Sequence, residues 1–258
     1  MKKTIFLWLF IAATLFASAQ GKTLYSVSTV KPKAGMKSAF EASWKTHLAK
    51  FHTKDDTRNV YEITSGAHSG SYMIVEGPIS YADMDIEKTT DKAHSMDLEA
   101  NFAPKLESSM EATYRWDDTA SYNGKVAAEK FSVQVTHIKY GMQNQTLREA
   151  KRGSLVNAKL NPNDRFSYNS YVQILSGSDP VIVNVRNLKD GFKEMENNYY
   201  GPNPMAGQPD AFKNAYIKDY GQADWDARQK LLVDNANVAS REAYMMVLRK
   251  DLSSPAAK

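Results

Sequence analysis

The chain has 258 residues, a formal net charge of +4 and no cysteine. The lack of cysteine excludes disulfides, cysteine-ligated zinc and a cysteine nucleophile, so packing alone has to stabilise the fold. Basic and acidic residues are interspersed without a lysine–arginine stripe, which argues against a nucleic-acid partner.

The first 19 residues have the pattern of a bacterial export signal. Two lysines precede an uninterrupted apolar run, Ile5–Phe16, which is followed by the small-x-small site Ala17-Ser18-Ala19. The apolar run is shorter than the roughly 20 residues that a membrane-spanning helix needs. We expect cleavage after Ala19, no stable membrane insertion afterwards, and a periplasmic or secreted protein. Removing 19 of 258 residues leaves 239, enough for one large domain or two small ones.

The first half of the mature chain predicts the element order βαββαβ. "TLYSVSTVK" (23–31) alternates and is rich in β-formers, and "NVYEITS" and "SYMIVEG" form a strand pair joined by "GAHSG". A broken helical pattern over 80–106 precedes a last strand, "SSMEATYRW". One face of the first predicted helix has three- and four-residue spacing and comprises Met36, Ala39, Phe40, Ser43, Trp44, His47, Leu48 and Phe51.

The second half repeats this order, which indicates an internal duplication. Gly35-Met36 and Gly141-Met142 are 106 residues apart, and Ser65-Gly66 and Ser176-Gly177 are 111 apart. "SSMEATY" and "ASREAYM", at the last strands, are 131 apart. The growing offset predicts insertions, the largest at 197–221. We expect units at 20–120 and 128–252, joined by the turn-rich linker 117–127.

A βαββαβ unit is the ferredoxin-like module, which leaves one face of its sheet uncovered. Two such units in tandem resemble the dimeric α/β-barrel superfamily, which includes antibiotic-biosynthesis-monooxygenase-like proteins. The resemblance implies an α+β fold in which both units form one pseudo-dimeric barrel, with a ligand cleft between the helices and the sheet of a unit. Members of this superfamily include cofactor-free oxygenases that act on aromatic polyketides, haem-degrading enzymes and proteins without known activity, and the resemblance leaves these three possibilities for this chain.

The haem degraders of this superfamily carry a histidine on the second helix and an asparagine and a tryptophan across the cleft. Here the second helix of the first unit contains His94, in "DKAHSMDLEANF". Trp44 lies on a different element and the matching strand has no asparagine, so the full set is not reproduced. The sequence therefore makes haem one option and leaves the cofactor unspecified.

His47 is the other candidate catalytic residue, on the apolar helix face beside Trp44, a candidate ligand contact. Its counterpart in the second half is near Ser154. It either lines the cleft as a base or ligand, or packs against a backbone carbonyl. His52 is five residues on, outside the i, i+4 spacing that puts two ligands on one helical face, which argues against a His47/His52 metal pair. His68 is expected in solvent.

Two further features could contact a ligand. Several predicted strands carry polar faces that either line a wet cavity or face solvent, with Glu62 and Arg186 as charged members that require partners. The insertion at 197–221 contains Tyr199 and Tyr200, which suit a recognition loop or a packed lid. The acidic pairs Asp55-Asp56 and Asp117-Asp118 are best explained by turns or caps.

No common catalytic or nucleotide-binding motif is present in the sequence. Two functions remain. The first is a noncatalytic exported protein that binds a small molecule or an envelope protein through the cleft or the tyrosine-rich insertion. The second is a barrel-type monooxygenase or a haem-binding or haem-degrading enzyme, with His47 or His94 near the reacting centre. Either is compatible with a homodimer.

Overall fold

The computed structural model describes residues 21–52, 56–85, 92–123, 127–160, 167–174, 180–196, 210–233 and 236–255. The expected export signal, the second Ser-Gly turn, and Tyr199 and Tyr200 lie outside these ranges.

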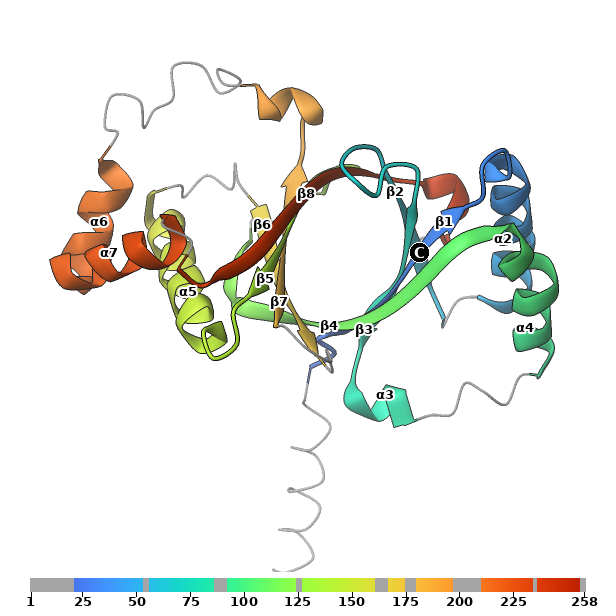
Figure 1. Cartoon of the computed structure of the whole chain (residues 1–258), viewed down its shortest axis with the longest axis horizontal. Helices are drawn as coiled ribbons and strands as arrows, with labels where there is room; N and C mark the ends of the chain where they lie inside the picture. The colour runs from blue at the N-terminus through green and yellow to red at the C-terminus, as the bar shows by residue number, and fades with distance from the viewer. Residues whose placement is uncertain are drawn as a thin grey trace, which may run out of the picture.

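Eight antiparallel strands form one closed barrel in the order β1-β3-β2-β8-β5-β7-β6-β4 (Figure 1). Each half contributes four adjacent strands, β4-β1-β3-β2 and β8-β5-β7-β6, in the order typical of a ferredoxin-like unit. The predicted α+β fold with two tandem ferredoxin-like units is therefore confirmed. The strands are β1 (Leu24–Pro32), β2 (Arg58–Ile63), β3 (Tyr72–Ile79), β4 (Leu106–Asn123), β5 (Lys130–Ile138), β6 (Ser167–Ile174), β7 (Val181–Leu188) and β8 (Val238–Leu248).

The helices lie outside the barrel (Figure 1). The first unit has α2 (Lys37–Phe51), α3 (Tyr81–Asp85), α4 (Lys92–Asp97), the π-helical turn η2 (Leu98–Phe102) and η3 (Ala103–Lys105). The second has α5 (Gln143–Leu160), η4 (Phe192–Met195), α6 (Ala211–Tyr220), α7 (Gln222–Arg228), η5 (Gln229–Val233) and, after β8, η6 (Lys250–Leu252). Helices α2 and α4 lie at one end of the molecule, and α5, α6 and α7 lie at the other (Figure 1).

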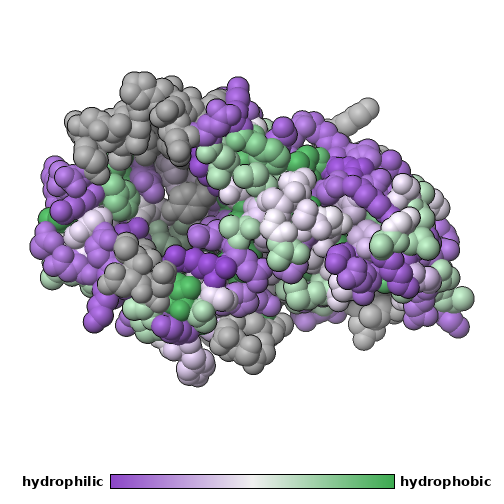
Figure 2. Space-filling model, turned by 45° about the horizontal axis from the view of Figure 1, so that its top comes forward, coloured by the Kyte–Doolittle hydropathy of each residue, from purple (hydrophilic) through white to green (hydrophobic). Residues whose placement is uncertain are grey.

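On the face drawn in Figure 2, hydrophilic residues spread over both ends of the molecule, and hydrophobic residues form small, separate patches. Among the described helices, none combines the length and the apolar character that crossing a bilayer would need.

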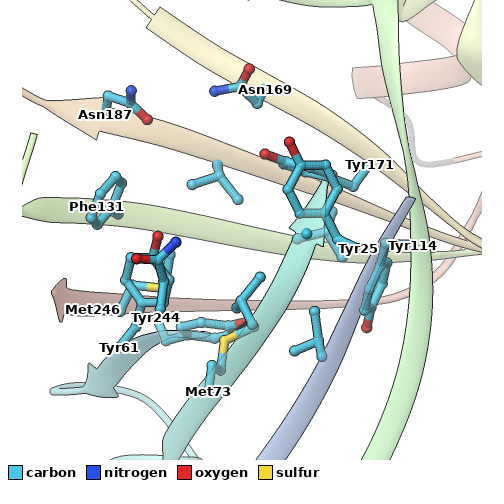
Figure 3. A pocket seen from close by; sticks show the side chains of 16 residues that line it. Tyr25, Tyr61, Met73, Tyr114, Phe131, Asn169, Tyr171, Asn187, Tyr244 and Met246 are labelled. Carbon is cyan, nitrogen blue, oxygen red and sulfur yellow. Dashed lines mark hydrogen bonds between the residues drawn. The ribbon is translucent and has the colours of Figure 1, made fainter. Parts of the chain in front are cut away.

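Both faces of the barrel sheet pack against protein, so polar and apolar residues do not simply alternate along its strands. On β1, Ser26, Ser28 and Val30 face the helices of the first unit, whereas Tyr25 and Val27 face the barrel interior. The interior holds an apolar cluster around Phe131, Val183 and Met246, lined by tyrosines (Figure 3).

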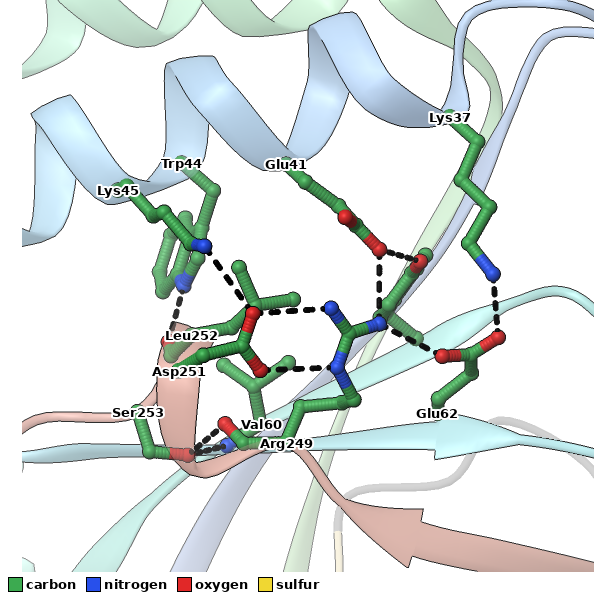
Figure 4. A network of polar contacts seen from close by, with 11 residues as sticks. Lys37, Glu41, Trp44, Lys45, Val60, Glu62, Arg249, Asp251, Leu252 and Ser253 are labelled. Carbon is green, nitrogen blue, oxygen red and sulfur yellow. Dashed lines mark hydrogen bonds and ion pairs between the residues drawn. The ribbon is translucent and has the colours of Figure 1, made fainter.

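The chain returns to the first unit after β8 and fastens α2 to the sheet (Figure 4). Leu252 is fully buried in the core beneath α2, and its carbonyl accepts a 2.7 Å hydrogen bond from Trp44 Nε1. Arg249 Nη1 donates to Glu41 and to Glu62, at 2.7 Å each, and Arg249 also makes two hydrogen bonds to Asp251. The last residues of the second unit are thus structural parts of the first.

The predicted linker is shorter than expected, because β4 continues through its first part to Asn123. Asp117 Oδ1 accepts hydrogen bonds from the backbone N–H groups of Thr119 and Ala120, as expected for a turn residue. The register with β6 shifts between Asp117 and Tyr122, so the local turn interrupts the strand pairing and does not end it.

The described end of the predicted insertion, α6, packs against α5. Its Tyr216 has no exposed surface and donates a hydrogen bond to the buried Glu149 of α5. This part of the insertion therefore belongs to the core of the second unit, because Tyr216 satisfies a carboxylate that would otherwise be buried without its hydrogen bond.

We expect Arg249→Gln to lower the free energy of unfolding by roughly 2 kcal/mol at pH 7, since it removes charge-assisted hydrogen bonds to three carboxylates. Hydrogen bonds from Arg249 lower the pKa of Asp251 and of Glu41. A lowered folded-state pKa gives stability that is present above the unfolded-state pKa of about 4 and is lost as the pH falls through the folded-state pKa.

In urea unfolding, the stability difference between wild type and variant should therefore start to shrink below about pH 4 and disappear only below the folded-state pKa values of Asp251 and Glu41. Lys31→Gln is the control, because its ion pair with Glu107 is exposed and should contribute less than about 1 kcal/mol. An Arg249→Gln effect no larger than that of the control would contradict the assigned role.

Candidate functional site: a histidine cluster in the cleft of the first unit

Three histidines of the first unit converge between α2 and α4, which lie together at one end of the molecule (Figure 1). His47 lies on the buried face of α2 with Trp44 and Leu48 and is 1% exposed. His94, on α4, packs against it with 4.7 Å between the ring centroids. The 3.6-residue period of α2 places His47 inward, and the packing of α4 supplies its neighbour.

His52 joins this cluster because it has left the helix. α2 ends at Phe51, and His52 is the C-cap residue, with φ −114° and ψ 75° and its N–H bonded to the Leu48 carbonyl. Its Nε2 lies 3.2 Å from His47 Nε2 and 3.4 Å from His94 Nε2. The expectation that five-residue spacing separates His47 from His52 was wrong, because that argument assumed a continuing helix.

Two carboxylates hold the rings from behind. Asp97, the last residue of α4, lies 2.7 Å from His47 Nδ1, and Asp56 lies 2.8 Å from His52 Nδ1. Arg58, the first residue of β2, forms ion pairs with Asp56, two residues before it, and with Glu76 of β3. A carboxylate only accepts hydrogen bonds, so both Nδ1 atoms carry a proton; in the neutral form of each ring, Nε2 then has a lone pair, and both Nε2 atoms point toward the centre of the cluster.

The charges around the cluster keep these carboxylates ionised. Burial opposes ionisation of Asp56, but the hydrogen bond to His52 and the charge of Arg58 outweigh it and lower the pKa of Asp56 to about 2. The hydrogen bond from His47 and a second from Asn101 lower the pKa of Asp97. For His47 burial is the larger effect and lowers its pKa, despite the opposing hydrogen bond to Asp97, so its neutral form is favoured.

The cluster has the dimensions of a transition-metal site. Two nitrogens bound tetrahedrally at about 2.0–2.1 Å from a zinc ion are about 3.3–3.4 Å apart, and His52 Nε2 lies 3.2 and 3.4 Å from the Nε2 atoms of His47 and His94. All three ligand atoms lie within 4.8 Å of one another. A cation between them would relieve the repulsion of the facing lone pairs. Carboxylate partners on the outer ring nitrogens are the usual support of histidine ligands.

The cluster borders a cleft of about 370 Å³ between the helices and the sheet of the first unit. The cleft is also lined by Ser26 and Ser28 of β1, by Trp44, and by the acidic side chains Glu76, Glu99 and Glu111. The polar strand face at Ser26 and Ser28 thus faces a cavity. An acidic cleft of this size has room for a small molecule beside a bound cation.

The equivalent place in the second unit has no histidine. Gly153 and Ser154 occupy the corresponding turn of α5, and a side chain at Gly153 would meet the guanidinium of Arg228 at 3.3 Å. Arg228 donates to the Glu149 carbonyl and packs over the rings of Phe212 and Tyr216. In the second unit, the Arg228 side chain therefore occupies the space that the His47 imidazole occupies in the first unit.

The other predicted site residues lie in different surroundings. Trp44 lines the cleft but is mainly a packing residue, 3% exposed and hydrogen bonded to Leu252. Glu62 takes part in the Arg249 network and pairs with Lys37 at 2.6 Å. Arg186 lines a separate cleft of about 540 Å³ in the second unit and pairs with the buried Glu194. His68 is exposed, as expected, and also lies 3.1 Å from Glu242.

Sequence reasoning missed Asp56, Asp97 and Arg58. Asp56 was explained as a turn residue, although its i, i+4 relation to His52 was a usable signal. Asp97 follows His94 by three residues on the same helix, so the two share a face. No pattern could indicate that this face meets α2, because the contact spans 50 residues.

Comparison with known proteins supports the fold and leaves the activity open. No family model and no curated protein matches the sequence. An anthrone oxidase-like protein matches the structure with a TM-score of 0.56 and 12% identity, over 93% of this chain and 96% of that one. Two proteins named "putative monooxygenase" match as well. The one from Lactobacillus acidophilus has a TM-score of 0.51 and 8% identity, over 91% of this chain and 96% of that one. The one from Fusobacterium nucleatum has a TM-score of 0.52 and 12% identity, over 92% of this chain and 96% of that one.

These full-length matches show that the chain shares the fold of those proteins, here two ferredoxin-like units that form one closed barrel.

We expect Trp44→Phe to lower the free energy of unfolding by roughly 1–3 kcal/mol, because the buried Leu252 carbonyl would lose its donor. Tyr140→Phe, at an 89% exposed position, is the control and should change stability by less than about 0.5 kcal/mol. Chemical unfolding measures both. Equal stability of the two variants would contradict the packing role assigned to Trp44.

Proposed function

We propose that this chain is an exported, metal-dependent enzyme of the oxygenase type. Its centre would be a first-row transition-metal ion held by His47, His52 and His94, and its substrate a small organic molecule in the cleft of the first unit. The convergence of three imidazole Nε2 atoms, two of them supported by carboxylates, carries the proposal.

The donor set selects the class of metal. Three imidazoles suit zinc, copper and iron, whereas magnesium and calcium require mostly oxygen ligands. Three protein ligands leave coordination positions for substrate or dioxygen, as catalytic sites require. When bound, such an ion would polarise or activate a ligand beside the cleft, and Ser26, Ser28 and Glu111 could orient a polar group there.

Haem fits these residues less well than a single ion does. An axial histidine has to aim its free nitrogen at open space that receives the macrocycle. Here the Nε2 atoms of His47 and His94 both point at His52, at 3.2 and 3.4 Å. The oxygenase alternative is therefore favoured in its non-haem form.

The oxygenase class is supported by the fold shared with the anthrone oxidase-like protein and the two monooxygenase-named proteins. At 8–12% identity their substrates do not transfer residue by residue. Oxygen consumption by the metal-loaded protein with anthrone tests this class first. Tight metal binding without oxygen consumption on anthrone or related phenols would favour the noncatalytic binding protein and leave the metal site intact.

The purified mature protein should bind one Fe²⁺, Cu²⁺ or Zn²⁺ per chain, measured by elemental mass spectrometry after dialysis. His52→Ala should reduce occupancy at least tenfold, because it removes the central ligand of the three. His68→Ala is the matched control and should keep full metal occupancy, since His68 is exposed and contacts Glu242, which is not part of the histidine cluster. Unchanged stoichiometry in His52→Ala would contradict the proposed site.

Asp56→Asn and Asp97→Asn should each weaken metal binding about 10- to 100-fold, because the carboxylates orient and polarise the ligands. Competition with a chromophoric chelator measures the affinity. Asp219→Asn, which removes an exposed pair with Lys159, should leave it unchanged. A loss of affinity in the Asp219 variant equal to that in the Asp56 variant would indicate an unspecific charge effect.

A further inference from the structure

The barrel encloses a second cavity of about 300 Å³, on the other face of the sheet from the histidine cluster (Figure 3). It shares no lining residue with the first-unit cleft. All eight strands contribute to its wall, so the cavity exists only when the barrel is closed.

The wall of this cavity is uncharged and rich in tyrosine. Five tyrosines line it, together with asparagines, valines, methionines and Phe131, and no acidic or basic side chain is among its described lining residues. Burial raises the pKa of all five, so their hydroxyls stay neutral at physiological pH; they are Tyr25, Tyr61, Tyr114, Tyr171 and Tyr244. A charged ligand would lose its hydration here without compensation.

Several hydroxyls converge on the cavity as hydrogen-bonding groups. Within the described part of the chain no hydrogen bond engages the hydroxyls of Tyr25, Tyr61 and Tyr171. Tyr25 and Tyr171 are in direct ring contact, and Tyr61 lines the same cavity. None of the three is a fully buried unpaired atom, so each hydroxyl remains accessible to water or to a ligand oxygen inside the cavity.

Two edge-to-face aromatic pairs line the cavity beside these hydroxyls. Tyr25 and Tyr171 pack edge to face with centroids 5.4 Å apart, and Tyr61 and Phe131 do the same at 5.4 Å. Gly77 makes room for one of them, because a Cβ there would lie 2.7 Å from the Tyr25 ring. The ring faces and edges that line the cavity favour an aromatic guest, which can add further edge-to-face or stacked contacts.

Small side chains keep the cavity open. An eight-stranded barrel is just wide enough for side chains to fill it, yet Val27, Val75, Val183 and Val185 stand at lining positions. Cavities lower stability, so a barrel serving only as a scaffold would be expected to fill this space.

We propose that the barrel interior is a second binding site, specific for a small, uncharged aromatic molecule that carries a hydroxyl or carbonyl oxygen. The site is independent of the metal centre and does not rest on the oxygenase activity.

Isothermal titration of the full mature protein with 2-naphthol, 2-naphthoate and naphthalene tests it. 2-Naphthol should bind once per chain, and 2-naphthoate at least tenfold more weakly, because its carboxylate would be buried without a partner. The double variant Tyr61→Phe/Tyr171→Phe should weaken 2-naphthol about tenfold and leave naphthalene unchanged.

Val185→Trp should fill the cavity and abolish 2-naphthol binding while metal content stays at one per chain. Tyr140→Phe is the surface control and should bind as wild type does. Should Val185→Trp fail to fold, the Tyr-to-Phe pair alone decides. The proposal would be overturned if wild type did not bind 2-naphthol or bound 2-naphthoate with equal affinity. It would also be overturned if a folded Val185→Trp variant, or the Tyr61→Phe/Tyr171→Phe variant, bound 2-naphthol as wild type does.

Discussion

Closure of the sheet between the two units is the constraint on which the other features depend. Each four-stranded unit has two edge strands with unpaired backbone groups, and those edges meet as β2 with β8 and β4 with β6. The β2–β8 contact pairs only three residues of each strand, Tyr61–Ile63 and Met246–Leu248. The segment after β8 extends it, since Arg249 N–H donates to the Val60 carbonyl and Ser254 N–H to the Arg58 carbonyl. The C-terminal segment therefore both closes the barrel and completes the first unit.

Closure divides the molecule into an inside and an outside with different chemistry. The inside is uncharged, tyrosine-rich and walled by all eight strands. The outer clefts lie between each half-barrel and its own helices, and there the charges gather. Adjacent residues of β1 serve both sides, Ser26 in the histidine cleft and Val27 in the interior. One strand can thus support two sites without competition, because successive side chains point to opposite faces.

The duplication preserved the backbone and changed the clefts. Strand pairing makes Ser26 and Ser132 equivalent, opposite Glu76 in one unit and Arg186 in the other. Along the helices, Trp44 and His47 correspond to Ala150 and Gly153 at the 106-residue offset. The first cleft therefore combines imidazoles with carboxylates, whereas the second contains arginines beside small helix residues. A single set of strand contacts tolerates both, since the backbone groups make the pairing while the side chains that differ project from the sheet into the clefts.

The sequence by itself determined the order of elements, the duplication and the inward position of His47 and Trp44, because these follow from local periodicity and from comparison of the halves. It could also have paired Asp56 with His52, four residues apart. Only the tertiary structure decided that His94 and Asp97 meet α2, that His52 turns back at the end of its helix, and that Glu62 finds Arg249 187 residues away. These contacts depend on how α4 and the C-terminal segment pack against α2, and no local pattern of side chains specifies that packing.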